Sequence, residues 1–149
     1  ILDELQRDGG LTNQQLAERV GLSASPCSRR VRALEDAGVI RRRVTLLDHR
    51  KLGLSLTVIV LIGMDRHTPE RFASFEEQVA AYPEVQECYL ITGQEADYQL
   101  KVVVPDMDTY QEFLLNRLTR IPGVSGVHSS FVLRRVIDNT ELPLAYVES

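Results

Sequence analysis

The chain has 149 residues, of which 44% are hydrophobic, 26% charged and 6% aromatic, a composition that excludes collagen-like, disordered and disulfide-scaffold proteins. Its two cysteines are too few for a disulfide framework, and this predicts a reducing, cytoplasmic environment. The longest apolar stretch, Leu56 to Met64, is far shorter than the roughly 20 residues of a membrane helix, so we expect no membrane partner.

The formal net charge of -4 conceals an uneven distribution along the chain. Up to Arg50 there are nine arginines and seven acidic residues, whereas the remainder has eight basic and fourteen acidic residues. Seven of the arginines lie between Arg19 and Arg43, together with two acidic residues. This predicts a basic, anion-binding N-terminal module on an acidic body, the alternative being that the arginines form an ordinary solvated face.

The first twenty residues carry the spacing of two short amphipathic helices. The apolar residues within 1–5 share one face of a first helix, which we expect to stop at Gly9. A second helix is predicted to begin at a capping box, in which Thr12 is followed three residues later by Gln15, and to end at Gly21.

A third helix is predicted to begin with Ser25 as its N-cap and Pro26 at its first position, and to end at Gly38. Its buried stripe is expected to consist of Cys27, Val31 and Leu34. Two helices joined by a four-residue turn, the second of them rich in arginine, have the form of a helix-turn-helix. The following residues 39–47 read as a strand carrying arginines, which predicts a wing that tracks DNA phosphates.

Hydrogen-bonding and cationic side chains on these elements are suited to base edges and phosphates. Arg30 lies toward the flank of the third helix, where we expect it to contact phosphate or Glu35. The residues expected to contact DNA are Thr12, Asn13, Gln14, Ser23, Ser25, Pro26, Ser28, Arg29, Arg30, Arg32, Arg41, Arg42 and Arg43.

The second half of the chain alternates strand-like and helix-like segments. The expected elements are a strand from Ser55, a helix from Thr68, strands over 85–92 and 98–104, a helix capped by Asp106 that includes Arg117 and Leu118, and a strand over 123–136. The near-continuous apolar character of the first strand predicts burial on both faces, by helices on one side and a partner subunit on the other. The order βαββαβ predicts an α+β fold of the ferredoxin-like kind, whose open edges favour dimerisation.

Sequence patterns for catalysis or metal binding are lacking. The chain has no phosphate-binding glycine loop and no nucleophile elbow, and His49, His67 and His128 are far apart without ligand-spaced partners. Cys27 falls on a predicted buried stripe and Cys88 in a predicted strand, which indicates inert core thiols. We therefore expect no catalytic residues, no metal and no cofactor.

The combination resembles the Lrp/AsnC family of prokaryotic transcriptional regulators over essentially the whole chain. The resemblance is carried by residues 1–6, 16–23, 27, 30–35 and 38–40 in the first half, and by Gly93, Asp97-Tyr98, 104–107 and 118–124 in the second. It implies a winged helix-turn-helix domain over residues 1–48, a linker over 49–54, a ferredoxin-like effector-binding (RAM) domain over 55–137 and a C-terminal tail over 138–149. Members form dimers, tetramers or octamers and typically respond to amino acids.

The resemblance also implies an effector site between protomers. The residues it indicates are Leu90, Thr92, Gly93, Gln94, Glu95, Ala96, Asp97, Tyr98, Met107, Ser130, Phe131 and Val132. Gly93 lets backbone N–H groups approach a carboxylate, and Asp97 or Glu95 can receive an ammonium group, which describes a site for an amino-acid zwitterion. The loop is one residue longer than the usual Gly-x-x-Asp-Tyr. From the residues alone, Gly93 to Tyr98 also reads as a plain hairpin turn with a packed tyrosine.

We thus predict a sequence-specific transcriptional regulator that is not an enzyme. Its expected partners are double-stranded DNA with a roughly palindromic operator, a small amino-acid effector, and further copies of itself as a homodimer, tetramer or octamer. Two alternatives remain: an enzyme acting on a tetrapyrrole, like the haem-precursor decarboxylases that resemble this family and use convergent histidines, and a structural partner domain without a ligand.

Overall fold

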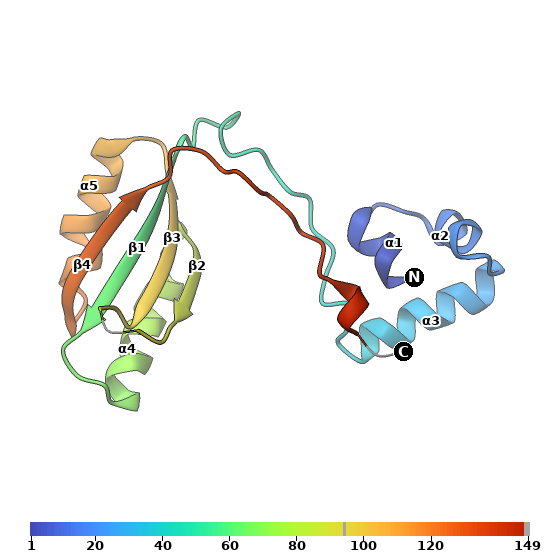
Figure 1. Cartoon of the computed structure of the whole chain (residues 1–149), viewed down its shortest axis with the longest axis horizontal. Helices are drawn as coiled ribbons and strands as arrows, with labels where there is room; N and C mark the ends of the chain where they lie inside the picture. Colours follow the sequence, from blue (N-terminus) through green and yellow to red (C-terminus); the bar gives the residue numbers. More distant parts are fainter. Residues whose placement is uncertain (94, 148–149) are drawn as a thin grey trace. The chain divides into compact units, whose positions relative to one another are not determined.

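The computed structural model describes residues 1–93 and 95–147, and it divides the chain into two compact units (Figure 1). Unit 1 comprises Ile1–Leu47 together with the C-terminal segment from Val136, and unit 2 comprises Asp48–Arg135. The chain therefore enters unit 2 once and afterwards returns to unit 1. Part of the segment expected as a tail contacts the first helix, since the Gln6 side chain exchanges hydrogen bonds with the Leu142 backbone at 2.9 and 3.2 Å.

The described part of unit 1 contains three α-helices and a short 3-10 helix, Leu144–Tyr146. The bounds of the α-helices are α1 Leu2–Arg7, α2 Asn13–Val20 and α3 Ala24–Asp36. Its fully buried core consists of Leu16, Ala17 and Cys27, against which partly buried residues such as Leu5 and Val31 pack. The buried position of Cys27 is confirmed.

The predicted ends of α2 are confirmed. Thr12 Oγ1 accepts a hydrogen bond from the Gln15 backbone N–H at 3.1 Å, and the Gln15 side chain accepts one from the Thr12 N–H at 2.9 Å. Gly21 ends the helix with a φ of 71°, a left-handed conformation that side-chain-bearing residues adopt at a cost. The turn between α2 and α3 is therefore fixed by local chemistry.

The predicted start of α3 is wrong by two residues. Ser23, and not Ser25, is the N-cap, with an extended ψ of 161°, and its carbonyl accepts the hydrogen bond from the Cys27 N–H at 3.2 Å. Pro26 is accommodated at the third helical position because the first four N–H groups of a helix have no partner within it, so the missing donor is not needed there.

The strand expected over residues 39–47 is wrong. The N–H groups of Val39 and Ile40 turn back to the Leu34 carbonyl, at 3.0 and 3.2 Å, and residues 41–48 then have no regular secondary structure. A strand is stabilised by hydrogen bonds to a neighbouring strand, and the described part of unit 1 supplies none. The arginines of this segment are consequently carried on extended chain.

Unit 2 is a four-stranded sheet with two helices. The elements are β1 Leu56–Met64, α4 Pro69–Ala80, β2 Val85–Leu90, β3 Tyr98–Val104, α5 Met107–Asn116, a 3-10 turn Leu118–Arg120 and β4 Val124–Phe131. The strand order is β2-β3-β1-β4 and every pair is antiparallel. This is the predicted ferredoxin-like βαββαβ arrangement, which confirms the α+β fold of this half.

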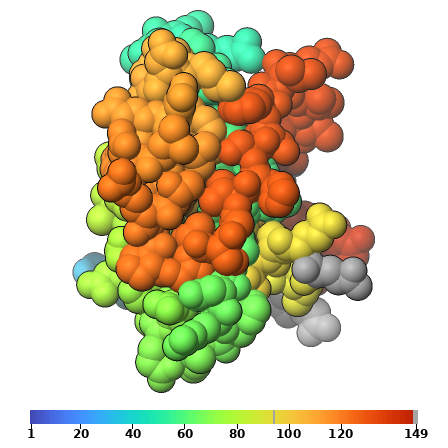
Figure 2. Space-filling model, turned by 90° about the vertical axis from the view of Figure 1, so that its left-hand side faces the viewer, coloured from blue at the N-terminus to red at the C-terminus, as the bar shows by residue number. Residues whose placement is uncertain are grey.

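The two helices cover one face of the sheet, and Figure 2 shows α5 in orange and α4 in light green on the same side of the unit. Alternate residues of β1 follow this layering: Val58, Val60 and Ile62 are fully buried, whereas Ile59 and Leu61 face the other side and are half-buried. Within this chain, one face of the sheet is thus closed and the opposite face is partly open.

Three expectations for unit 2 need correction. The strand expected over 123–136 ends at Phe131. Its partner β1 begins at Leu56, so after the hydrogen bond from the Val132 N–H to the Thr57 carbonyl no residue of β1 is left to pair with it. The helix expected to include Arg117 and Leu118 ends at Asn116.

The third correction concerns Cys88, expected to be a core thiol. It is exposed because β2 is the edge strand, and its helix-facing side chains line an open hollow beside α4. Partial burial in this hollow, together with the Glu76 carboxylate, raises the pKa of the Cys88 thiol to about 11, so the thiol stays protonated near neutral pH.

Candidate DNA-binding and effector sites

The outward surface of the helix-turn-helix carries the residues predicted to contact DNA. Pro26 is partly buried, whereas the others are exposed: Thr12, Asn13, Gln14, Ser23, Ser25, Ser28, Arg29, Arg30, Arg32, Arg41, Arg42 and Arg43. Opposite them on α3, Cys27 is fully buried. Helix α3 therefore presents a polar, cationic stripe to solvent and an apolar stripe to the core.

Two of these residues also build the motif. The Thr12 hydroxyl is engaged in the capping box. The Asn13 side chain donates a hydrogen bond to the Ala24 carbonyl at 3.0 Å, which ties the first turn of α2 to the first residue of α3. Asn13 thus sets the position of α3 against α2, a role that its sequence position did not indicate.

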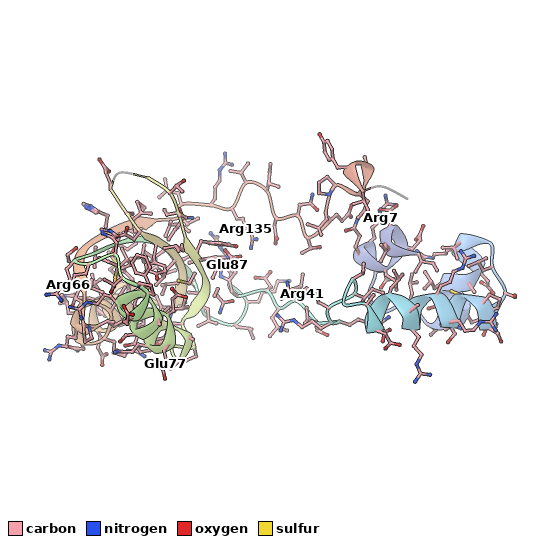
Figure 3. The ribbon with its side chains drawn as sticks, turned by 90° about the horizontal axis from the view of Figure 1, so that it is seen from below. Arg7, Arg41, Arg66, Glu77, Glu87 and Arg135 are labelled. Carbon is pink, nitrogen blue, oxygen red and sulfur yellow. The ribbon has the colours of Figure 1, made fainter. Side chains whose placement is uncertain are left out.

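The arginines are mostly left without internal partners. Arg43 pairs with Glu35 at 3.3 Å. Glu35, one of the two partners expected for Arg30, is therefore engaged by the segment that follows α3. For Arg29, Arg32 and Arg41, residues 1–93 and 95–147 supply no ion-pair partner, and Figure 3 shows Arg41 on the extended segment that follows α3. Unpaired guanidinium groups on one surface attract polyanions.

The residues indicated as the effector site lie in two groups in unit 2. Leu90 pairs with Tyr98 beside Ile62, which places residues 90–93 and 95–98 near the C-terminal end of β1. Phe131 pairs with Val58 near the start of β1. Ile62 and Val58 are four residues apart in β1, so at about 3.3 Å per residue these paired positions are separated by roughly 13 Å along the strand.

The second group lies near the start of β1. Its members are the exposed Met107, Ser130 and Phe131 and the half-buried Val132. The Phe131 ring meets the Tyr110 ring edge-on at 5.7 Å, and the Tyr110 hydroxyl hydrogen-bonds with Ser129. One copy of the chain does not bring the two groups together.

In the first group, Asp97 is held by four hydrogen bonds. Its backbone N–H donates to the Ile62 carbonyl at 2.8 Å and its carbonyl accepts from the Ile91 N–H at 2.9 Å. Its carboxylate accepts from the Met64 N–H at 2.7 Å and lies 2.9 Å from His67 Nε2. The carboxylate is therefore fixed at the end of β1, and neither Met64 nor His67 was indicated by the sequence because both lie about thirty residues away.

Tyr98 faces the core. Its side chain is 1% exposed, it packs against the Phe75 ring at 4.5 Å, and its hydroxyl donates a hydrogen bond to Glu76 at 2.5 Å. Burial and the Glu76 carboxylate raise the pKa of Tyr98 above its usual value. The alternation of Tyr98 with Leu100 is the sequence signal for this inward orientation.

The remaining loop residues present backbone and one carboxylate to solvent. Thr92, Gly93 and Glu95 are exposed, Ala96 is half-buried, and Gln94 lies outside the described residues. Gly93 has a φ of 153°, a backbone conformation that side chains disfavour, and an added Cβ would meet open space. The loop therefore leaves room for a ligand to approach its backbone.

Within the described ranges, no group of three or more His, Cys, Asp or Glu side chains is placed to hold a metal ion. His49 Nδ1 lies 2.7 Å from the Leu54 carbonyl and His67 pairs with Asp97, so these two histidines engage separate parts of unit 2.

No helix in the part of the chain that the structure describes is long and apolar enough to span a membrane.

Two family models match the chain. Residues 1–41 match a winged helix-turn-helix DNA-binding model, and residues 57–142 match the Lrp/AsnC ligand binding domain. The chain is 42% identical over 142 residues to the leucine-responsive regulatory protein of Escherichia coli (strain K12), covering 95% of this chain and 86% of that protein.

Two solved structures extend the match to three dimensions. A transcriptional regulator from Neisseria meningitidis in complex with L-Met has a TM-score of 0.91 and 39% identity, covering 96% of this chain and 92% of the other. An AsnC family transcriptional regulator from Agrobacterium tumefaciens has a TM-score of 0.92 and 42% identity, with coverage of 99% and 95%. With its helix-turn-helix unit and ferredoxin-like unit, this chain belongs to the Lrp/AsnC family of transcriptional regulators.

Proposed function

We propose that this regulator binds double-stranded DNA through α3 and that a small amino acid bound to unit 2 controls that binding. The observation that carries the DNA-binding part is the exposed stripe of Ser28, Arg29 and Arg32, whose guanidinium groups have no internal partner among the described residues. Arg and Ser side chains read base edges in the major groove, whereas Arg41 and Arg42 on extended chain suit phosphates. The arginines concentrate here although the whole chain is acidic.

The effector is proposed to be an amino acid. This is supported by one relative that is leucine-responsive and another that was solved with L-Met. In this chain, the bare backbone around Gly93 is suited to a carboxylate and the exposed Glu95 to an ammonium group. The Asp97 carboxylate is already held from two sides, so we assign it the role of shaping the loop. Leu90, Met107 and Phe131 are exposed apolar groups that suit an aliphatic side chain.

A complete effector site requires two copies of the chain. The two groups of effector residues lie roughly 13 Å apart along β1 in one copy, so we infer that residues 90–93 and 95–98 of one copy face Met107 and 130–132 of another. The partly open sheet face with Ile59 and Leu61 offers an apolar surface for such pairing. We infer a homodimer or larger assembly on a roughly palindromic operator, a cytoplasmic location and no catalytic activity, as for relatives that are transcriptional regulators.

The DNA-binding part is tested by titrating operator and random DNA with single-arginine variants. We expect Arg29→Ala and Arg32→Ala to lose about 1–3 kcal/mol of operator preference, because each removes a base-reading group. Arg42→Ala should weaken both DNAs alike and lower the salt dependence of binding. Arg66→Ala removes the same charge from unit 2 and serves as the matched control; equal losses on both DNAs for every variant would contradict the base-reading role.

The effector part is tested by thermal denaturation with each of the twenty amino acids. A ligand that binds the folded protein raises the transition temperature, and at a concentration 100 times its Kd the gain is about 2.7 kcal/mol. Glu95→Gln should weaken the response to an amino acid without changing DNA binding in its absence. A flat profile across all twenty would instead favour a domain that assembles without a ligand.

A further inference from the structure

His67 closes a circuit of contacts around the candidate effector loop. It lies on the connection between β1 and α4, and its Nε2 is 2.9 Å from Asp97 Oδ1. Its ring meets the Phe72 ring edge-on at 5.9 Å, and Phe72 in turn meets the Tyr98 ring edge-on at 5.7 Å. Because Asp97 and Tyr98 are consecutive, these contacts join the end of the loop to the first turn of α4 in a ring.

The members of this circuit differ in how firmly they are held. Tyr98 is buried, and Asp97 is fixed by backbone hydrogen bonds to Ile62 and Ile91. The His67 side chain is 64% exposed, whereas that of Asp97 is 22% exposed. His67 can therefore be replaced without opening the core, yet it is the contact through which the outer carboxylate oxygen of Asp97 is held.

We propose that His67 is a positioning residue of the effector site, which holds the Asp97 carboxylate and so keeps residues 91–93 and 95–97 of the loop in the shape that receives an amino acid. A loop that is already ordered loses less conformational entropy when it binds a ligand. The same contacts link the loop to the first turn of α4. This inference rests on the proposed role of the loop as the effector site.

The test compares three variants of the full chain. His67→Ala removes both the polar contact and the ring contact. His67→Gln keeps an N–H donor near the position of Nε2 but lacks the ring. Arg66→Ala is the matched control, because Arg66 lies on the same connection, extends away from the unit in Figure 3 and contributes to no contact of the circuit.

Two measurements are made on each variant. Calorimetric titrations with L-leucine and with L-methionine should show affinity reduced roughly 3- to 10-fold in His67→Ala, the range expected for one lost hydrogen bond, and restored at least in part in His67→Gln. Amide hydrogen exchange without ligand should be faster at Ile91 and Asp97 in His67→Ala than in Arg66→Ala.

Unchanged affinity together with unchanged exchange in His67→Ala would overturn the proposal. Tighter binding in His67→Ala would also overturn it, since His67 would then compete with the ligand for Asp97. If the wild type binds neither amino acid, the effector assignment fails for both probes, and hydrogen exchange at Ile91 and Asp97 still decides whether His67 positions the loop.

Discussion

The two units of this regulator use their side chains in opposite ways. Unit 1 fully buries Leu16, Ala17 and Cys27, whereas the core of unit 2 has fourteen buried residues that include four aromatic ones. Stabilisation by burial grows with apolar area, so the small unit depends far more on caps and turns. The arginines of α3 are exposed, whereas Arg117 of unit 2 is paired with Glu84.

This difference separates residues that recognise a partner from residues that hold the fold. In unit 2, the Arg117 guanidinium lies 4.7 Å from the Phe113 ring and 5.3 Å from the Tyr82 ring while it hydrogen-bonds Glu84. That cation is engaged internally by an ion pair and two aromatic rings, although 40% of its side chain is exposed. An arginine on α3 without such neighbours retains its hydrogen-bonding capacity for DNA.

The largest expected effect is that of Phe113→Ala in unit 2. Phe113 is 0% exposed and packs against Tyr82, so its truncation should leave a cavity and destabilise unit 2 by about 3–5 kcal/mol. Differential scanning calorimetry should show the unit 2 transition at lower temperature. Leu115→Ala, at a 52% exposed position of the same helix, should change little. An equal shift of the unit 1 transition would contradict the independence of the two cores.

Leu16→Ala should have the corresponding effect in unit 1. Leu16 is 2% exposed, and its truncation should destabilise the unit by about 2–5 kcal/mol, a large share of what so small a core provides. We expect DNA binding to be lost while amino-acid binding to unit 2 persists, as measured by DNA titration and calorimetry on the same preparation. Simultaneous loss of both activities would show that the units fold as one.

Arg117→Ala should be milder and should depend on pH. Burial acts to raise the pKa of Glu84, but hydrogen bonds from Arg117 and the backbone, and the charge of Arg117, outweigh it and lower the pKa. A carboxyl whose pKa is lowered by folding stabilises the folded state at pH values above its pKa in the unfolded chain. This stabilisation is lost as the pH falls through the pKa in the folded state. We expect a loss of about 1–2 kcal/mol at neutral pH in urea denaturation.

The pH series supplies the control for this variant. The ion-pair part of the difference between wild type and Arg117→Ala should shrink on acidification, whereas the part due to packing on Phe113 and Tyr82 should remain. A difference that stays constant down to acidic pH would assign the whole effect to packing.

Gly21→Ala should have the smallest effect of the four. At a φ of 71° an added Cβ meets no neighbouring atom, so the change tests backbone strain alone. We expect about 1 kcal/mol of destabilisation confined to unit 1, measured by its thermal transition. Gly21→Asn, which tolerates the left-handed conformation better, is the matched control and should retain more stability.

Much of the fold follows from signals that are local in the sequence. Thr12 and Asp106 cap helices as expected, Gly21 ends α2, and the alternation from Leu100 to Val104 marks β3. The caps and the helix end depend on side chains and backbone within four residues, so a sequence pattern contains what determines them.

The features that could not be predicted depend on distant residues. Ser23 and Ser25 are equally good caps by type, and the backbone conformation at Ser23 decides between them. Cys88 lies on an apolar pattern, but its burial depends on how far α4 extends over the edge strand. In the candidate site, the pairing of Asp97 with His67 joins residues 30 positions apart.

Because the chain returns to unit 1, two backbone segments connect the sheet to that unit. β1 begins and β4 ends at the same end of the sheet, as neighbouring strands with Val58 opposite Phe131. Both segments that run to unit 1 therefore leave from adjacent positions. If β4 slides along β1, the offset between these segments changes, whereas a joint movement of both strands leaves the offset as it was. A single connecting segment would move in the same way in both cases. With two segments, sliding of β4 along β1 and a joint movement of both strands can be distinguished by whether the offset changes.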